Sequence, residues 1–226
     1  MGLGNMAANA ALDAAQKKAE MNRMLKGRTP DQQKVIKYFY GAGGCLSKGL
    51  SDEEYESMVA SAAKSMDFKQ KALNKIGLDE SQVQEIEPVH FDSYYFSQKN
   101  DNLNKPRNDY KWRSSEYQIT WIFFGDDQVY VYQYTMNMAS GSKKEKTMDY
   151  FYKDITNFTS ASKTYEKEVL DKVSCTGQAT YVRKTVDVNE FTIIVPGDKV
   201  TCSMDQNDYT ERAIQGMKAK LREKKI

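Results

Sequence analysis

The chain has 226 residues, 40% of them hydrophobic, and its 33 basic side chains nearly balance 31 acidic ones. A net charge of +2 gives no reason to expect nucleic-acid binding, and the first 87 residues carry 12 basic and 12 acidic side chains. No apolar run approaches the ~20 residues that cross a bilayer. The three cysteines are odd in number and far apart, which favours buried thiols over a disulfide framework. We therefore expect a cytoplasmic protein without a transmembrane segment.

The first predicted helix covers residues 5–26, which are good helix formers followed by Gly27. Alanine fills most of its apolar positions, so the helix has little area to bury and is marginal alone in water. It is either a frayed terminal helix or a helix that docks on a protein partner or on a second copy of the chain.

Three further helices are predicted between residues 30 and 87. The first begins at Thr29-Pro30-Asp31 and ends at the glycine cluster 41–44. That cluster lacks the Gly-Lys-Ser/Thr ending of a P-loop and follows a helix, so a turn is a better interpretation than a phosphate site. Ser51 and Glu54 form a capping box for the next helix, and Asp67 begins a third.

The composition changes at Pro88. Twelve of the 15 tyrosines and both tryptophans follow it, whereas 12 of the 17 alanines precede it. Alanine favours helices and aromatic residues favour sheets. We therefore divide the chain into an N-terminal helix (1–29), a small helical region (30–87) and a β-rich domain (88–226).

Residues 117–138 form the strongest predicted element, a β-hairpin. Two arms rich in aromatic and β-branched residues flank the polar turn 125–127. With the turn centred on Asp126 and Asp127, the pairs on one face are Phe123 with Tyr130, Trp121 with Tyr132, Ile119 with Tyr134, and Tyr117 with Met136. A slip of one residue would split the aromatic side chains between the two faces. We expect the first register, with this aromatic face turned into the closed interior of the β-rich domain.

The remaining strands are predicted to be short and to follow one another closely. Residues 98–115 and 139–146 are expected to be polar loops. The last element is a helix over residues 207–224, with Ala213, Ile214, Met217 and Leu221 on one face. The predicted strands besides the hairpin cover residues 89–97, 147–153, 155–162, 169–173, 187–195 and 199–204.

About seven strands followed by one amphipathic helix resemble the pleckstrin-homology-like (PH-like) fold. The segments Phe123–Tyr132 and Tyr150–Ile155 are similar to those of bacterial PH-like and GRAM-like domains. The resemblance covers residues 88–226 and implies an antiparallel β-barrel capped by the C-terminal helix. Together with the N-terminal helical region it gives an α+β protein. It also implies a non-enzymatic interaction or scaffolding module of a bacterial-type cytosolic protein.

One loop is the candidate binding site. It holds basic side chains in Lys-x-Arg spacing beside an aromatic residue, namely Lys105, Arg107, Lys111, Trp112 and Arg113. In phosphoinositide-binding PH domains, which this loop resembles by position, such a spacing places two cations on a phosphate. Trp112 would then insert at the membrane interface. Peripheral binding to a membrane surface or an anionic lipid headgroup is therefore the alternative function.

Little in the sequence indicates catalysis. His90 is the single histidine, which excludes triads or metal sites that need two. No Cys-x-x-Cys motif is present, and a zinc site from His90 and three scattered cysteines has no supporting spacing. We expect no metal, no cofactor and no catalytic residue. The competing hypothesis is an enzyme with a carboxylate pair in a cleft between the two halves of the chain.

Overall fold

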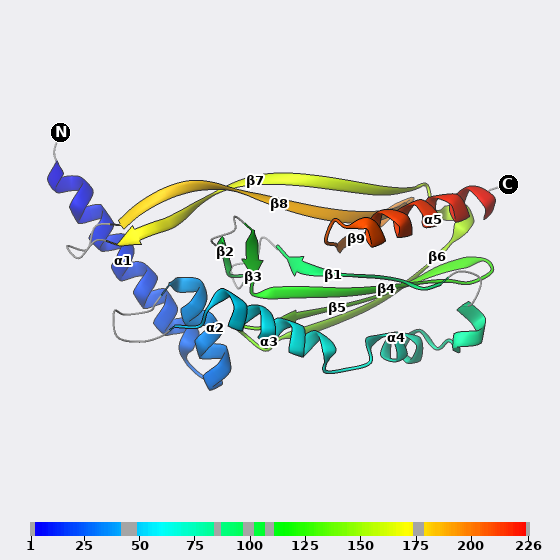
Figure 1. Ribbon diagram of the computed structural model, residues 1–226, viewed down its shortest axis with the longest axis horizontal. Helices are drawn as coiled ribbons and strands as arrows, with labels where there is room; N and C mark the ends of the chain where they lie inside the picture. Colours follow the sequence, from blue (N-terminus) through cyan, green and yellow to red (C-terminus); the bar gives the residue numbers. More distant parts are fainter. Residues whose placement is uncertain are drawn as a thin grey trace.

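The computed structural model describes residues 3–41, 49–83, 87–96, 102–106, 111–173 and 179–224; for residues 3–11, 13–14, 165, 167–173 and 179–181 it describes the backbone alone. Figure 1 shows three layers: helices on one side, a sheet in the middle, and a second sheet with the last helix on the other side. In chain order the elements are α1 (Leu3–Leu25), α2 (Pro30–Tyr40), α3 (Asp52–Lys64), α4 (Phe68–Ile76), the 3-10 helix η1 (Glu80–Val83), β1 (Val89–Tyr95), β2 (Asn104–Pro106), β3 (Trp112–Ser114), β4 (Glu116–Phe124), β5 (Gln128–Asn137), β6 (Lys143–Phe151), the 3-10 helix η2 (Tyr152–Asp154), β7 (Asn157–Val173), β8 (Ala179–Val195), β9 (Asp198–Ser203) and α5 (Asp208–Lys224).

The helices begin where their capping residues predict. The Ser51 hydroxyl accepts a hydrogen bond from Glu54 N (3.1 Å), and the Glu54 carboxylate accepts one from Ser51 N (2.7 Å). This confirms the capping box of α3. Asp67 caps α4 by accepting from Gln70 N, and α2 begins at Pro30 with Thr29 as its capping residue. None of the described helices combines the length and the apolarity needed to cross a membrane.

The middle layer is an antiparallel sheet with strand order β1-β4-β5-β6. The predicted hairpin register is confirmed, because Trp121 pairs with Tyr132 and Phe123 pairs with Tyr130. The aromatic side chains therefore lie on one face of β4 and β5, as the sequence predicts.

That aromatic face lies against the helices, so the prediction that it fills a closed interior is wrong. Phe123 and Tyr132 share a core with Val35 and Ile36 of α2. The reason is that the alternate residues nearest the β4–β5 turn are apolar as well, so this part of the sheet is buried on both faces. The second face packs toward the other sheet, with Ile122, Phe124, Val129 and Val131 in its core.

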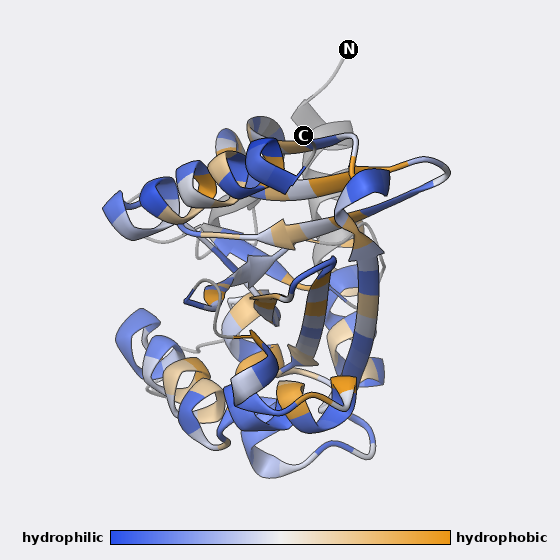
Figure 2. Ribbon diagram, turned by 90° about the vertical axis from the view of Figure 1, so that its right-hand side faces the viewer, coloured by the Kyte–Doolittle hydropathy of each residue, from blue (hydrophilic) through white to orange (hydrophobic). Residues whose placement is uncertain are grey.

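The third layer combines the sheet β7-β8-β9 with α5. The predicted apolar face of the C-terminal helix is confirmed, since Ile214, Met217 and Leu221 lie in the core between the two sheets. Figure 2, turned by 90°, keeps α5 and this sheet on the side opposite the helices. Within the described residues the two large sheets are paired separately, so the closed barrel stays a prediction.

Several predicted boundaries are wrong. The expected loop 98–115 contains β2 and β3, which pair with each other. The expected loop 139–146 ends early, because β6 begins at Lys143. The two short strands expected between residues 155 and 173 are one 17-residue strand, β7, which pairs along its length with the 17-residue β8.

Polar side chains fill one end of the space between the two sheets. Gln118 Oε1 accepts a hydrogen bond from Ser203 N (2.9 Å), and Gln133 Nε2 donates one to Thr201 O (2.9 Å). Both glutamines belong to the middle sheet and both partners belong to β9. These side chains give the buried backbone groups of β9 partners across the layers, so the third layer is held in register on the middle sheet.

Candidate functional site

The structure places Trp112 and Arg113 of the predicted binding loop between the layers. Trp112 is 6% exposed and its indole N–H donates a hydrogen bond to Thr185 O (2.6 Å) in β8. The ring also packs with Val186 and Val188. A buried indole with its N–H satisfied is an anchor between β3 and β8, whereas insertion at a membrane interface would require the same ring at the surface.

Arg113 is also buried. Its Nε donates to Glu56 Oε1 (2.7 Å), Nη2 contacts the same carboxylate, and Nη1 donates to Trp112 O (3.1 Å). The guanidinium lies over the Tyr94 ring at 5.4 Å. Buried charges are tolerated when they are paired and hydrogen-bonded, and this pair ties β3 to α3 of the helical layer.

The other basic residues of the predicted site lie apart from each other. Lys105 Nζ lies 4.2 Å from the centre of the Tyr38 ring, and burial lowers the pKa of Lys105 while the Asp52 carboxylate opposes the shift. Lys111 is exposed. Arg107 lies outside the described residues. The structure therefore brings Lys111, Trp112 and Arg113 together at one cleft and directs Lys105 toward the helices.

The cleft at Lys111 and Arg113 measures about 640 Å³ and lies between α3, β1, β3 and β8. Three carboxylates also line it, those of Glu56, Asp187 and Asp205. The Asp205 carboxylate accepts a hydrogen bond from the Ser93 hydroxyl (2.7 Å). Because acidic groups outnumber basic ones, the cleft does not attract a phosphate by its net charge.

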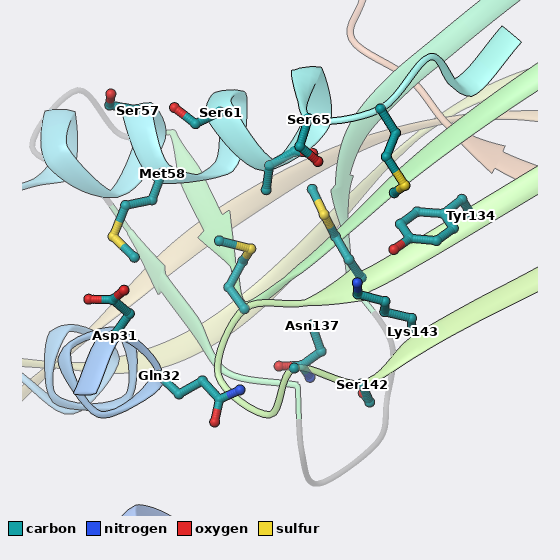
Figure 3. A pocket seen from close by; sticks show the side chains of 15 residues that line it. Asp31, Gln32, Ser57, Met58, Ser61, Ser65, Tyr134, Asn137, Ser142 and Lys143 are labelled. Atoms are coloured by element: carbon teal, nitrogen blue, oxygen red, sulfur yellow. The ribbon is translucent and has the colours of Figure 1, made fainter. Parts of the chain in front are cut away.

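A second hollow, which we call the methionine groove, lies between α3 and the β5–β6 turn. Its volume is about 470 Å³. Figure 3 shows Ser57, Ser61 and Ser65 following α3 along one wall, with Met58 pointing into the groove. Its lining residues are Asp31, Gln32, Ser57, Met58, Ser61, Ala62, Ser65, Met66, Tyr134, Met136, Asn137, Met138, Gly141, Ser142 and Lys143.

The floor of the groove depends on a tight turn after β5. Asn137 Oδ1 accepts hydrogen bonds from Ala139 N (2.9 Å) and Ser140 N (3.0 Å). Gly141 has φ 72°, and a Cβ there would collide with the Gln32 amide of α2. Arg28 Nη1 donates to Ser140 O (3.0 Å). These contacts hold the turn against the helical layer, so the floor of the groove is fixed in position.

The groove offers thioether, hydroxyl and amide groups. Methionine is flexible and polarisable, so it adapts to apolar side chains of different shape. Met58 and Met138 are half-buried and Met66 is 37% exposed. The two charged lining residues, Asp31 and Lys143, are exposed, and Asp31 pairs with Lys34 at 3.0 Å. The lining suits binding of an apolar side chain beside a polar rim.

Sequence reasoning missed this groove because its lining comes from four separate segments: the start of α2, α3, the end of β5, and the turn into β6. No single segment carries a recognisable motif. One signal in the sequence is the i, i+4, i+8 spacing of Met58, Ala62 and Met66, which begins in α3 and ends just after it. The other is the i, i+2 spacing of Met136 and Met138 at the end of β5.

His90 and Cys202, which were considered as metal ligands, make contacts inside the fold instead. His90 stacks on Trp121 with ring centres 4.9 Å apart, and its Nε2 lies 3.5 Å from Asp92 Oδ1. Cys202 is buried, and burial raises the pKa of its thiol to about 12. Cys45, Cys175 and residues 42–44 of the glycine cluster lie outside the described residues. No group of three potential metal ligands occurs in the part of the chain that the structure describes.

The N-terminal helix docks at its C-terminal end. Met21, Met24 and Leu25 pack against the core between the helices and the sheet. Tyr40 donates a hydrogen bond to Met24 Sδ (3.3 Å), and Leu12 is 60% exposed. Interaction of the outer part of α1 with a protein partner or a second copy stays a prediction.

Comparison with known proteins finds no matching family model, no matching curated protein and no matching solved structure.

Proposed function

We propose that the chain is a non-enzymatic interaction module on a PH-like scaffold, and that the methionine groove receives an apolar side chain of a partner protein. The order of the strands supports the scaffold: four strands form the first sheet, three form the second, and one helix follows. The short β2–β3 hairpin is an insertion after the first strand, and the helical layer is an addition to the outer face.

The single observation that carries this proposal is an apolar hollow that opens to solvent, in a molecule whose middle sheet is covered on both faces. Burying one leucine-sized side chain there would contribute about 1.5–3 kcal/mol. That value corresponds to weak binding by itself. A partner must therefore make further contacts around the groove, which is typical of a module that recognises a segment of protein chain.

The test is selection from a random peptide display library, followed by a comparison of two variants. Ala62→Glu places a carboxylate in the groove, and glutamate is a good helix former, so α3 should stay helical. Ala60→Glu makes the same change at an exposed position of α3 that lies outside the groove. We expect the selected peptides to carry apolar residues and to bind wild type and Ala60→Glu alike, but to lose binding to Ala62→Glu. Equal binding to all three proteins would contradict the proposal.

The enzyme hypothesis requires a carboxyl group whose pKa is raised. The pKa of the Glu145 carboxyl group and that of the Asp198 carboxyl group are both lowered. Hydrogen bonds from Lys71 and Lys75 lower the pKa of Glu145, and the Tyr150 hydroxyl lowers that of Asp198. This direction suits a charged group that holds structure in place, and it supports a binding module over an acid–base catalyst.

A further inference from the structure

The strand β6 forms one edge of the middle sheet. Its neighbour on one side is β5, and within the described residues no strand pairs with it on the other side. Every residue from Lys143 to Lys146, and Thr147 after them, is exposed. An exposed sheet edge is a template for pairing with another chain, because its outward backbone groups have no ladder partner.

The hydrogen-bond pattern shows which backbone groups of β6 point outward. Ser142 O accepts from Asn137 N (2.9 Å), and Asp127 O accepts from Tyr152 N (3.0 Å). In an antiparallel pair, every second residue exchanges bonds with the partner strand. The even-numbered residues from 142 to 152 therefore bond to β5. Lys143, Glu145 and Thr147 direct their N–H and C=O groups away from the sheet.

This edge is strongly basic. Lys143, Lys144 and Lys146 lie within four residues. The one acidic residue among them, Glu145, forms ion pairs with Lys71 and Lys75 of α4, the latter at 3.3 Å. Glu145 is thus paired with lysines of α4, while three lysines of β6 lie beside it in the sequence. Lysines on an edge repel a second copy of the same edge, whereas they attract a strand of opposite charge.

We infer that residues 143–147 of β6 accept an acidic, extended segment of a partner protein, which adds to the middle sheet as a further strand. This inference rests on the proposed function and names its partner class. Lys143 belongs both to the edge and to the lining of the methionine groove, so a segment paired with β6 reaches the groove at its end. Backbone pairing supplies affinity, and charge supplies selectivity.

The test uses a fluorescent heptapeptide that contains four glutamates with valine and threonine at the other positions. Its control is the same peptide with lysine in place of glutamate. Binding is measured by fluorescence anisotropy at low salt. We expect the acidic peptide to bind and the lysine peptide not to bind. The double change Lys144→Glu with Lys146→Glu should weaken the acidic peptide by about tenfold, because each exposed charge pair is reversed. Equal binding of the two peptides would refute the charge argument.

A second arm tests the backbone pairing. Thr147→Pro removes an outward N–H and no bond to β5, and proline is tolerated on edge strands. We expect it to abolish binding of the acidic peptide, whereas Thr147→Ala should bind like wild type. In case Thr147→Pro does not fold, the acidic peptide is also made with alternate amides N-methylated, which removes its donors and keeps its charge. Binding of that peptide equal to the unmodified one would overturn the inference.

The two proposals fail separately. Ala62→Glu acts on the groove, whereas Thr147→Pro acts on the edge. If Ala62→Glu leaves the selected peptides bound while Thr147→Pro still abolishes the acidic peptide, the groove proposal is wrong and the strand addition stands. A dimer of the wild-type chain without peptide, measured by light scattering and lost in Thr147→Pro, would show that β6 pairs with a second copy and would refute an acidic partner.

Discussion

Tyr55 links the helical layer to the sheet, and its removal should destabilise both together. The side chain is fully buried in α3, and its hydroxyl donates a hydrogen bond to Ser114 O (2.7 Å) in β3. Tyr55→Phe deletes that bond while it keeps the ring. Since Ser114 is also fully buried, water does not replace the lost donor. We expect the free energy of unfolding to fall by about 1–3 kcal/mol.

A larger truncation adds the loss of ring contacts. The Tyr55 ring stacks on Tyr38 with centres 4.9 Å apart, and it meets Phe39 edge-on at 5.2 Å. Tyr55→Ala loses the hydrogen bond and these contacts, and it leaves a cavity. Aromatic truncations in cores cost about 3–5 kcal/mol. The ordering expected is therefore wild type, then Tyr55→Phe, then Tyr55→Ala.

Urea unfolding distinguishes a shared core from two independent ones. Circular dichroism at 222 nm reports on the helices, and fluorescence reports on Trp112 and Trp121, both of which lie in the sheets. With a slope of about 2 kcal/mol per molar urea, Tyr55→Phe should lower the midpoint by roughly 0.5–1.5 M in both signals. Tyr209→Phe is the control: it removes a hydroxyl that accepts a hydrogen bond from His90 N (3.1 Å), but at an exposed position of α5 where water replaces it, so the midpoint should change little.

The reasoning would be refuted by transitions that separate. If Tyr55→Phe shifts the dichroism midpoint and leaves the tryptophan midpoint unchanged, the helices unfold independently of the sheet. The core shared by α2, α3, α4 and the aromatic face of β4 and β5 would then contribute no cooperativity.

Three further predictions follow from local geometry. Burial raises the pKa of Tyr55 well above 10 and that of Tyr40 to about 12. Because these tyrosines lose their protons at lower pH in the unfolded chain than in the folded one, the free energy of unfolding should fall as pH rises above about 10. Urea midpoints measured from pH 8 to 11 would show this fall. Gly141→Ala should lower the melting temperature and reduce the free energy of unfolding by about 1–2 kcal/mol, because φ there is 72° and Gln32 of α2 is in contact. Gly216→Ala, in a helix with open space around it, should raise the free energy of unfolding by about 0.5–1 kcal/mol. Co-sedimentation with phosphatidylserine vesicles should be the same for wild type and Lys111→Glu, because Trp112 is buried; a loss in the variant would favour the lipid hypothesis.

The hairpin register was predictable because both of its arms and its turn lie within 22 residues. The layer that covers its aromatic face was not predictable, since both faces of the hairpin are apolar near its turn and local pattern does not tell which layer covers which face. The change of composition at Pro88 suggested a separate helical region, yet Val35 and Phe123, far apart in sequence, lie in one core.

The short and the charged strands were missed for a different reason. β2 and β3 have three residues each, too few to show alternation. The start of β6 was predicted as a loop because its lysines make both faces polar, so the sequence shows no alternation of apolar and polar residues. An exposed edge strand can form without a buried face. Trp112 and Arg113 were predicted to contact a phosphate or lipid headgroup from a loop. Their surroundings depend on β8 and α3, which sequence spacing does not reveal.

The helices that cover one face of the middle sheet are synthesised before the strands on which they pack. The helices α2, α3 and α4 leave the ribosome first, while the strands that bury their apolar sides, β4 and β5, come later in the chain. Until residue 136 has emerged, these helices contact one another but lack the sheet face that completes their core. The apolar side chains that pack on the sheet therefore stay in contact with water or with chaperones until then. Slow docking of the helices on β4 and β5 would prolong this exposure and favour aggregation of the nascent chain.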